Sequence, residues 1–219
     1  MGRGGRRDRE ERLTSRKVGQ WATSSQDFLF VVSKLYALSS REAKRSRDGN
    51  WSGYVYAGIP LLLASIHAFI VEYENMLRPT SGVRRIDALD TLVAKRYGIT
   101  GSILEDFKDL IELRNELTHP VHLPTGTPDN WPDYLRRIKS LGLLNTTGRT
   151  DGDYDLLAQV ASHRLFRWAF GVVKAVFQAI VSSDPQRVLQ FQDLLKNLEA
   201  PWFPTTDDDE GMGALLKMV

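Results

Sequence analysis

The sequence predicts an all-α fold, a bundle of about five to six helices in which antiparallel neighbours surround one core. Two observations lead to this prediction. Apolar residues recur at intervals of three and four along most of the chain, which is the period of one helix face. No segment shows the alternation of a half-buried strand, and no glycine-rich phosphate loop is found. The 219 residues are enough for one substantial core.

Three helices are expected in the first half of the chain. The first two carry long apolar stripes and the third is short, and they cover residues 18–45, 54–77 and 86–97. A polar turn at 48–53 separates the first two. Pro79 follows the end of the second helix, and Gly98 follows the third.

A fourth helix is expected from Ser102, which forms a capping box with Glu105, to His119, where Pro120 disfavours helical geometry. Its apolar stripe comprises Ile103, Leu104, Phe107, Leu110, Ile111 and Leu117. A proline-rich loop follows. Three further helical segments are then expected, a short one, the longest apolar one and a last one, at 132–144, 153–181 and 185–198. The five long segments are the main helices of the predicted bundle, and 86–97 and 132–144 are short additions to it.

The composition of the chain is that of a soluble globular protein and excludes functions that depend on cysteine. Hydrophobic residues make up 42% and charged residues 26% of the chain, as in an ordinary soluble protein. The absence of cysteine excludes disulfides, thiolate metal ligands and a cysteine nucleophile. The N-terminus lacks the apolar core of a signal peptide, and charges interrupt the most hydrophobic stretch, 165–181. We therefore expect a cytoplasmic protein without a membrane span.

The two ends of the chain differ in charge. Residues 1–17 carry seven basic side chains and are expected to be a disordered basic arm. Residues 18–199 would form the helical domain, and 200–219 an acidic, poorly ordered tail. Both ends are expected to be solvated, and the alternative for the arm is a loose contact with phosphates.

Arg114 interrupts the stripe of the fourth helix, in a position where an apolar residue is expected. An arginine that faces the core needs a partner or an anionic ligand. His119, at the end of the same helix, can reach the same space. The pair predicts an anion clamp beside an acid/base group. The alternative is an ion pair between Arg114 and Glu72 or Glu74 of the second helix.

The segment Arg114-Asn115-Glu116-Leu117-Thr118-His119 resembles the Arg-x4-6-His signature of the HEPN superfamily, whose members commonly read Arg-Asn-x3-His. Those domains are small helical bundles that pair as homodimers, and the active members cleave RNA without metal where the two motifs meet. The resemblance implies a dimeric HEPN-like bundle that acts as a metal-independent RNA endonuclease with no cofactor. It also implies a toxin–antitoxin or phage-defence role, with an antitoxin such as a nucleotidyltransferase as a partner.

Within this interpretation His119 is the general acid/base, Arg114 clamps the phosphate, and Asn115 orients the imidazole or binds a phosphate oxygen. The alternatives are a histidine that caps helix carbonyls and an asparagine that bonds a neighbouring helix. Candidate RNA contacts are exposed basic residues, namely Arg84, Arg85, Arg136, Arg137 and Lys139.

The other histidines are interpreted differently. We expect His67 to be a packing residue with its hydrogen bonds satisfied, and His163 to be a surface group. His122 and His119 do not predict a metal site, because Pro120 prevents a continuous helix and no further ligand stands at suitable spacing. The alternative function is a non-catalytic HEPN-like module that binds nucleotide, RNA or a partner protein.

Overall fold

The computed structural model describes residues 25, 27–77, 89–118, 130–145 and 156–183. A first helix at 27–45 is followed by α2 (Val55–Leu77), α3 (Leu89–Tyr97), α4 (Gly101–Thr118), α5 (Asp133–Ser140), α6 (Leu156–Val160) and α7 (His163–Ser182). The all-α prediction is confirmed, and β-type pairing in the described ranges is limited to an isolated bridge between Trp51 and Ser162. The basic arm, the helix expected at 185–198 and the acidic tail lie outside the described residues.

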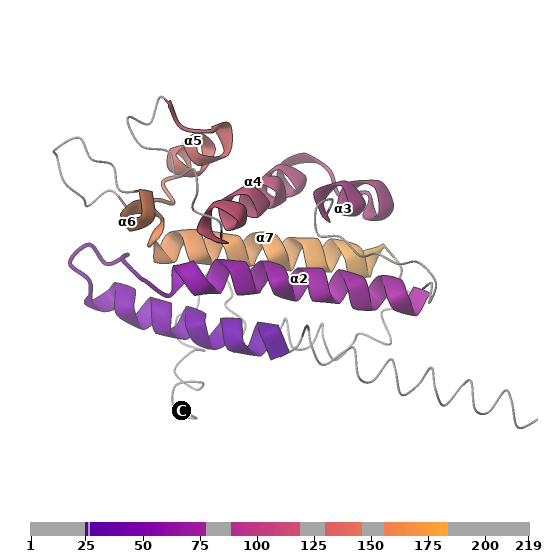
Figure 1. The fold of residues 1–219 in the computed structure, drawn as a ribbon, viewed down its shortest axis with the longest axis horizontal. Coiled ribbons are helices and arrows are strands. Elements are labelled where there is room, and N and C mark those ends of the chain that lie inside the picture. Colours follow the sequence, from indigo (N-terminus) through magenta and orange to yellow (C-terminus); the bar gives the residue numbers. More distant parts are fainter. Residues whose placement is uncertain (1–24, 26, 78–88, 119–129, 146–155, 184–219) are drawn as a thin grey trace, which may run out of the picture.

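Helices α2, α4 and α7 form the centre of the bundle. Helix α2 packs along α7, and α4 packs against both of them (Figure 1). Helix α3 contacts both α4 and α7. The main contacts of α5 are with α4. The first helix joins the bundle through Tyr36, whose ring lies edge-on to the rings of Phe166 and Phe170.

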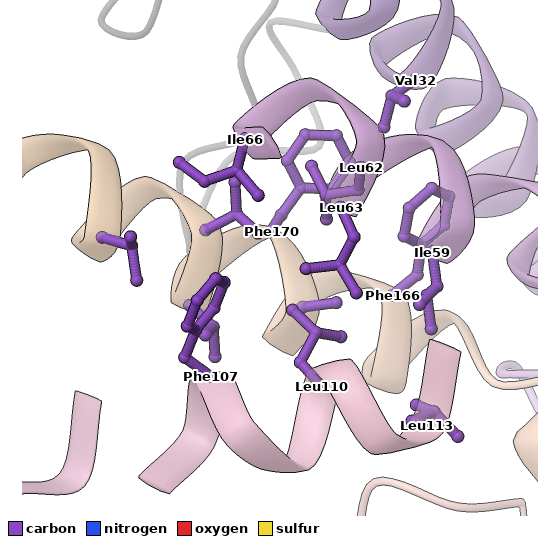
Figure 2. Close-up of a cluster of buried hydrophobic side chains, with 14 of the residues drawn as sticks. Val32, Ile59, Leu62, Leu63, Ile66, Phe107, Leu110, Leu113, Phe166 and Phe170 are labelled. Carbon is purple, nitrogen blue, oxygen red and sulfur yellow. The ribbon is translucent and has the colours of Figure 1, made fainter. Parts of the chain in front are cut away.

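Three fully buried side chains fix α4 on the other two central helices. Phe107, Leu110 and Leu113 point toward α2 and α7, as Figure 2 shows. They meet apolar side chains that include Ile59, Leu62, Leu63, Ile66, Phe166 and Phe170. Each such side chain contributes about 1.5–3 kcal/mol on burial. The position of the last turn of α4 is therefore set by packing over the two turns before it.

The stripe predicted for α4 needs two corrections. Ile103, its expected first member, is 38% exposed, whereas Leu113, which the prediction left out, is 1% exposed. Arg114 therefore lies beside the buried face, half-buried, and does not replace a core residue. The helix also begins at Gly101, one residue before the cap predicted at Ser102.

The prediction of one helix over 153–181 was wrong, because α6 and α7 are separated at Ser162. This residue is extended, with φ −123° and ψ 119°, and its side-chain oxygen accepts a hydrogen bond from Leu165 N as an N-cap. The Nδ2 atom of Asn50 donates to Ser162 Oγ at 2.9 Å, and His163 N donates to Asn50 O at 2.8 Å. These polar contacts stabilise a break that the apolar pattern does not reveal.

Two helices are long and apolar enough to cross a membrane by length and composition. They are the segments 55–72 and 163–182, and 56% of each is buried inside the bundle. The expectation that the protein has no membrane span stays a prediction. Mostly buried core helices of soluble proteins have the same properties.

Candidate functional site

The motif begins on the last turn of α4, where Arg114 and Asn115 lie. The Oγ1 atom of Thr118 donates a hydrogen bond to the carbonyl oxygen of Arg114 at 2.9 Å and to that of Asn115 at 3.2 Å. These are contacts of a threonine hydroxyl with the preceding turn of its own helix. His119 follows directly, and it lies outside the described residues, as do His122, Arg84 and Arg85.

The residue Arg114 is half-buried, and its guanidinium bonds to the neighbouring side chain. Its Nη1 atom donates to Asn115 Oδ1 at 3.1 Å. Asn115 itself is exposed. Within the described residues, no carboxylate forms an ion pair with Arg114. A partly desolvated arginine of this kind retains hydrogen-bond donors for an anion.

The two glutamates considered as partners of Arg114 are engaged elsewhere. Glu72 accepts hydrogen bonds from the backbone N and the Oγ of Ser25, at 3.3 and 2.7 Å. Burial raises the pKa of Glu72, and the two bonds from Ser25 act in the opposite direction. Glu74 pairs with Arg96 and accepts a hydrogen bond from Tyr97. Neither glutamate therefore forms the alternative ion pair.

Arg114 and Asn115 line a small cavity between α4, α2 and α3. Its volume is about 70 Å³, more than the roughly 10–15 Å³ that admits one water molecule. The remaining lining residues are mainly apolar, with one histidine: Leu63, Ala64, His67, Leu89 and Ile111. The cavity thus combines apolar walls with three polar side chains, and no carboxylate of the described part of the chain lines it.

His67 is the site residue that the sequence did not reveal. Its Nε2 atom is buried and has no hydrogen-bond partner among the described residues, so the expectation of a satisfied packing histidine was wrong. Burial lowers the pKa of His67, and the positive charge of Arg114 lowers it further. Both effects favour the neutral form of the ring. Periodicity placed His67 at the edge of the α2 stripe, but gave no information on which side chain faces it.

The candidate RNA contacts on α5 have partners within the protein. Arg137 forms ion pairs with Asp106 and Asp109 of α4, and so ties α5 to α4. Burial raises the pKa of Asp109, whereas Arg137 acts to lower it. Arg136 pairs with Asp133 in its own helix, and the Lys139 ammonium lies 5.4 Å from the ring centroid of Trp131. None of the three basic residues lines the cavity of Arg114.

A second, larger cavity of about 590 Å³ lies between α4, the turn after α5 and α7. Helix α7 contributes Arg164, Arg167 and Trp168 to it. Their spacing of three and four indicates one helix face, a signal that the sequence contained. The neighbouring His163 is not a surface group as expected. It is half-buried, and its Nδ1 lies 3.0 Å from Ser39 Oγ.

Comparisons with models of protein families, with characterised proteins and with solved structures find no match to this chain. The resemblance to the HEPN superfamily accordingly depends on the motif residues themselves.

Proposed function

We propose that the protein is a metal-independent RNA endonuclease of the HEPN type, with His119 as general acid/base, Arg114 as phosphate clamp and Asn115 as the residue that orients them. The observation that supports this proposal most is the position of Arg114. Arg114 is half-buried, has no carboxylate partner in the described ranges and lines a cavity at the end of α4. Such a site favours the charge of a phosphate.

The chemistry follows from the two residue types. The imidazole of His119 accepts the proton of a ribose 2′-hydroxyl while O2′ attacks the adjacent phosphorus. The P–O5′ bond breaks, and O5′ receives a proton from an imidazolium. The products are a 2′,3′-cyclic phosphate and a 5′-hydroxyl. The nucleophile belongs to the substrate, and Arg114 stabilises the negative charge that develops on the phosphorane oxygens.

The proposal includes a homodimer in the cytoplasm. One chain supplies one His119, whereas the reaction uses one group that accepts a proton and one that donates it. A two-fold interface would bring two sets of motif residues together. As a toxin or phage-defence effector, the enzyme would act on RNA and be restrained by an antitoxin such as a nucleotidyltransferase. Arg84, Arg85, Arg136, Arg137 and Lys139 are the proposed phosphate contacts along the RNA. Of these, Arg137 is engaged with Asp106 and Asp109, and Arg136 with Asp133.

The alternative is a module that binds a phosphate group without cleaving it. The same cavity supports this function, because Arg114 and the neutral His67 require only an anion to complete their contacts. Under this alternative, RNA or a nucleotide would bind to the wild-type protein and remain intact.

Incubation of the purified full-length protein with total RNA in EDTA distinguishes the two. We expect cleavage with 2′,3′-cyclic phosphate ends, and its loss in the double variant Arg114→Ala/His119→Ala. The matched control is Arg41→Ala, which removes an exposed arginine of the first helix and should cleave normally. The proposal fails if the ends are 3′-hydroxyls, if cleavage depends on an added divalent ion, or if the double variant remains active.

A further inference from the structure

Two side chains that line the same cavity have hydrogen-bonding atoms that no described residue uses. The guanidinium of Arg114 comes from α4 and has no ion pair within the described residues. The ring of His67 comes from α2, and its buried Nε2 has no acceptor or donor among them. Buried polar atoms of folded proteins are nearly always hydrogen-bonded, so a ring with an unpartnered nitrogen in the wall of a cavity is a candidate position for a ligand contact.

We propose that His67 and Arg114 together form a subsite for a phosphate oxyanion, in which His67 is a positioning residue that donates a hydrogen bond from its ring. The inference rests on the proposed function for the identity of the ligand, which is a phosphodiester group of RNA. The assignment adds to the motif a residue from a different helix, 47 positions before Arg114 in the chain.

The lining of the cavity favours an oxyanion over other small ligands. A guanidinium has five N–H donors in an arrangement that matches the oxygens of a phosphate. Arg114 uses one of these donors for Asn115, so the others can bind an anion. The apolar walls contributed by Leu63, Leu89 and Ile111 lower the local dielectric constant and strengthen the attraction. No carboxylate among the described lining residues would repel the anion. The volume of about 70 Å³ suits a small group and not a nucleobase with its sugar.

Binding of an anion would change the protonation of His67. In the empty site, burial and the charge of Arg114 lower the pKa of this ring. Within the described ranges, Arg114 is the one charged side chain in the lining of the cavity. The other lining residues from α3 and α4 are uncharged, namely Leu89, Ile111 and Asn115. An oxyanion beside Arg114 offsets that charge and accepts a hydrogen bond from the imidazolium. The bound anion should therefore raise the pKa of His67.

NMR of the histidine rings tests the subsite without reference to catalysis. The chain has four histidines, so each ring signal can be assigned with a single His→Gln variant. We expect inorganic phosphate to shift the His67 signal, and sulfate, which keeps its charge near neutral pH, to raise the pKa of that ring. Arg114→Ala should abolish both effects, and Arg41→Ala should preserve them. An unchanged His67 signal at millimolar anion, or an equal response in Arg114→Ala, overturns the subsite.

Kinetics test the role of His67 in the reaction. For His67→Gln we expect KM for RNA to rise roughly 10- to 100-fold, because one charge-assisted hydrogen bond to the substrate is lost. The value of kcat should change little. A fall in kcat of about 10²–10⁴-fold at unchanged KM would instead make His67 an acid/base group and overturn the positioning role. If the wild-type ring responds to phosphate but RNA remains intact, the nuclease proposal fails and the subsite stands. If RNA is cleaved but the ring does not respond to either anion, the subsite fails and the nuclease proposal stands.

Discussion

Gly58 of α2 lies directly against the ring of Phe166 on α7, and a Cβ atom at position 58 would stand 2.8 Å from the Cε2 atom of that ring and closer still to its Cζ atom. Phe166 is fully buried in the core and packs on Tyr36 and Phe170 as well. The ring therefore has little room to move aside. The absence of a side chain at position 58 sets how closely α2 approaches α7, and α2 also carries His67 into the cavity.

Gly58→Ala should destabilise the protein, because the added methyl group overlaps a ring that the core holds in place. Overpacking of this kind costs about 1–3 kcal/mol in the free energy of unfolding, which urea denaturation measures. The matched control is Gly171→Ala on α7, where a Cβ would meet nothing within 4 Å. That change should leave stability unaltered or raise it by about 0.4–1 kcal/mol. Equal effects of the two substitutions would contradict the packing argument.

Local patterns in the sequence predicted the helices but not the contacts that modify them. Apolar spacing placed α2 within one residue of its observed start, because both periodicity and turn residues are local signals. The break between α6 and α7 was missed, since Ser162 contacts Asn50, which lies 112 residues earlier. Likewise, an apolar stripe alone does not show that Gly58 meets an aromatic ring.

In the candidate site, too, local patterns could be predicted from the sequence and long-range contacts could not. Arg114 was identified because a charge interrupts an apolar pattern, which is visible in the sequence. The unpartnered Nε2 of His67 and the place of this residue in the wall of the cavity depend on how α2 and α4 pack, and no local pattern reports that. For the same reason the sequence did not predict the ion pairs of Arg137 with Asp106 and Asp109, which lie 31 and 28 positions earlier.

The stability of the protein should depend on the protonation of His67. Its pKa in the folded state is lowered from the ordinary histidine value of about 6.5, so the unfolded chain binds the proton first as the pH falls. The free energy of unfolding should accordingly decrease as the pH drops below the ordinary value, and be retained above it. His67→Gln removes this contribution. In urea denaturation from about pH 8 to about pH 5, the wild type should lose stability relative to the variant toward acid, and parallel curves would contradict the prediction.

His119→Ala should abolish most RNA cleavage while leaving the fold intact. Loss of a proton shuttle typically slows a reaction by about 10²–10⁴-fold, whereas a histidine at a helix end contributes little to folding. Cleavage rates on one defined RNA, together with the helical circular dichroism signal and Tm, measure both effects. Equal rates for the variant and the wild type would remove His119 from the mechanism.

Arg114→Ala should reduce cleavage without a large loss of stability. The side chain makes a hydrogen bond to Asn115 and no ion pair in the described part of the chain, so its removal leaves no described carboxylate buried without a counterion. Arg137→Ala is the contrasting variant, since it would leave Asp106 and Asp109 without their cation. It should be the less stable of the two in denaturant. Loss of several kcal/mol in Arg114→Ala with full activity would identify a structural ion pair.

We expect a homodimer in solution, with the two His119 side chains facing a shared cleft lined by Arg114 of both subunits. The mass by light scattering at micromolar concentration should be near twice the 24.8 kDa of one chain. An isologous interface places the same surface of each subunit face to face, and the polar end of α4 is the surface that would be completed by a copy of itself.

Complementation tests the shared cleft more directly than mass does. Arg114→Ala and His119→Ala homodimers should each be nearly inactive. A heterodimer of the two variants contains one intact Arg114 and one intact His119 on opposite subunits, and it lacks the second His119. The remaining imidazole can accept the proton of the 2′-hydroxyl and, once charged, return it to O5′. Mixing and refolding should therefore restore cleavage above that of either parent but well below that of the wild type. The control mixes the His119→Ala variant with the double variant, which supplies neither a histidine nor a second arginine, and should remain inactive. A monomeric mass, or a dimer whose mixed variants stay as inactive as their parents, would contradict a site shared between subunits and would favour the binding module.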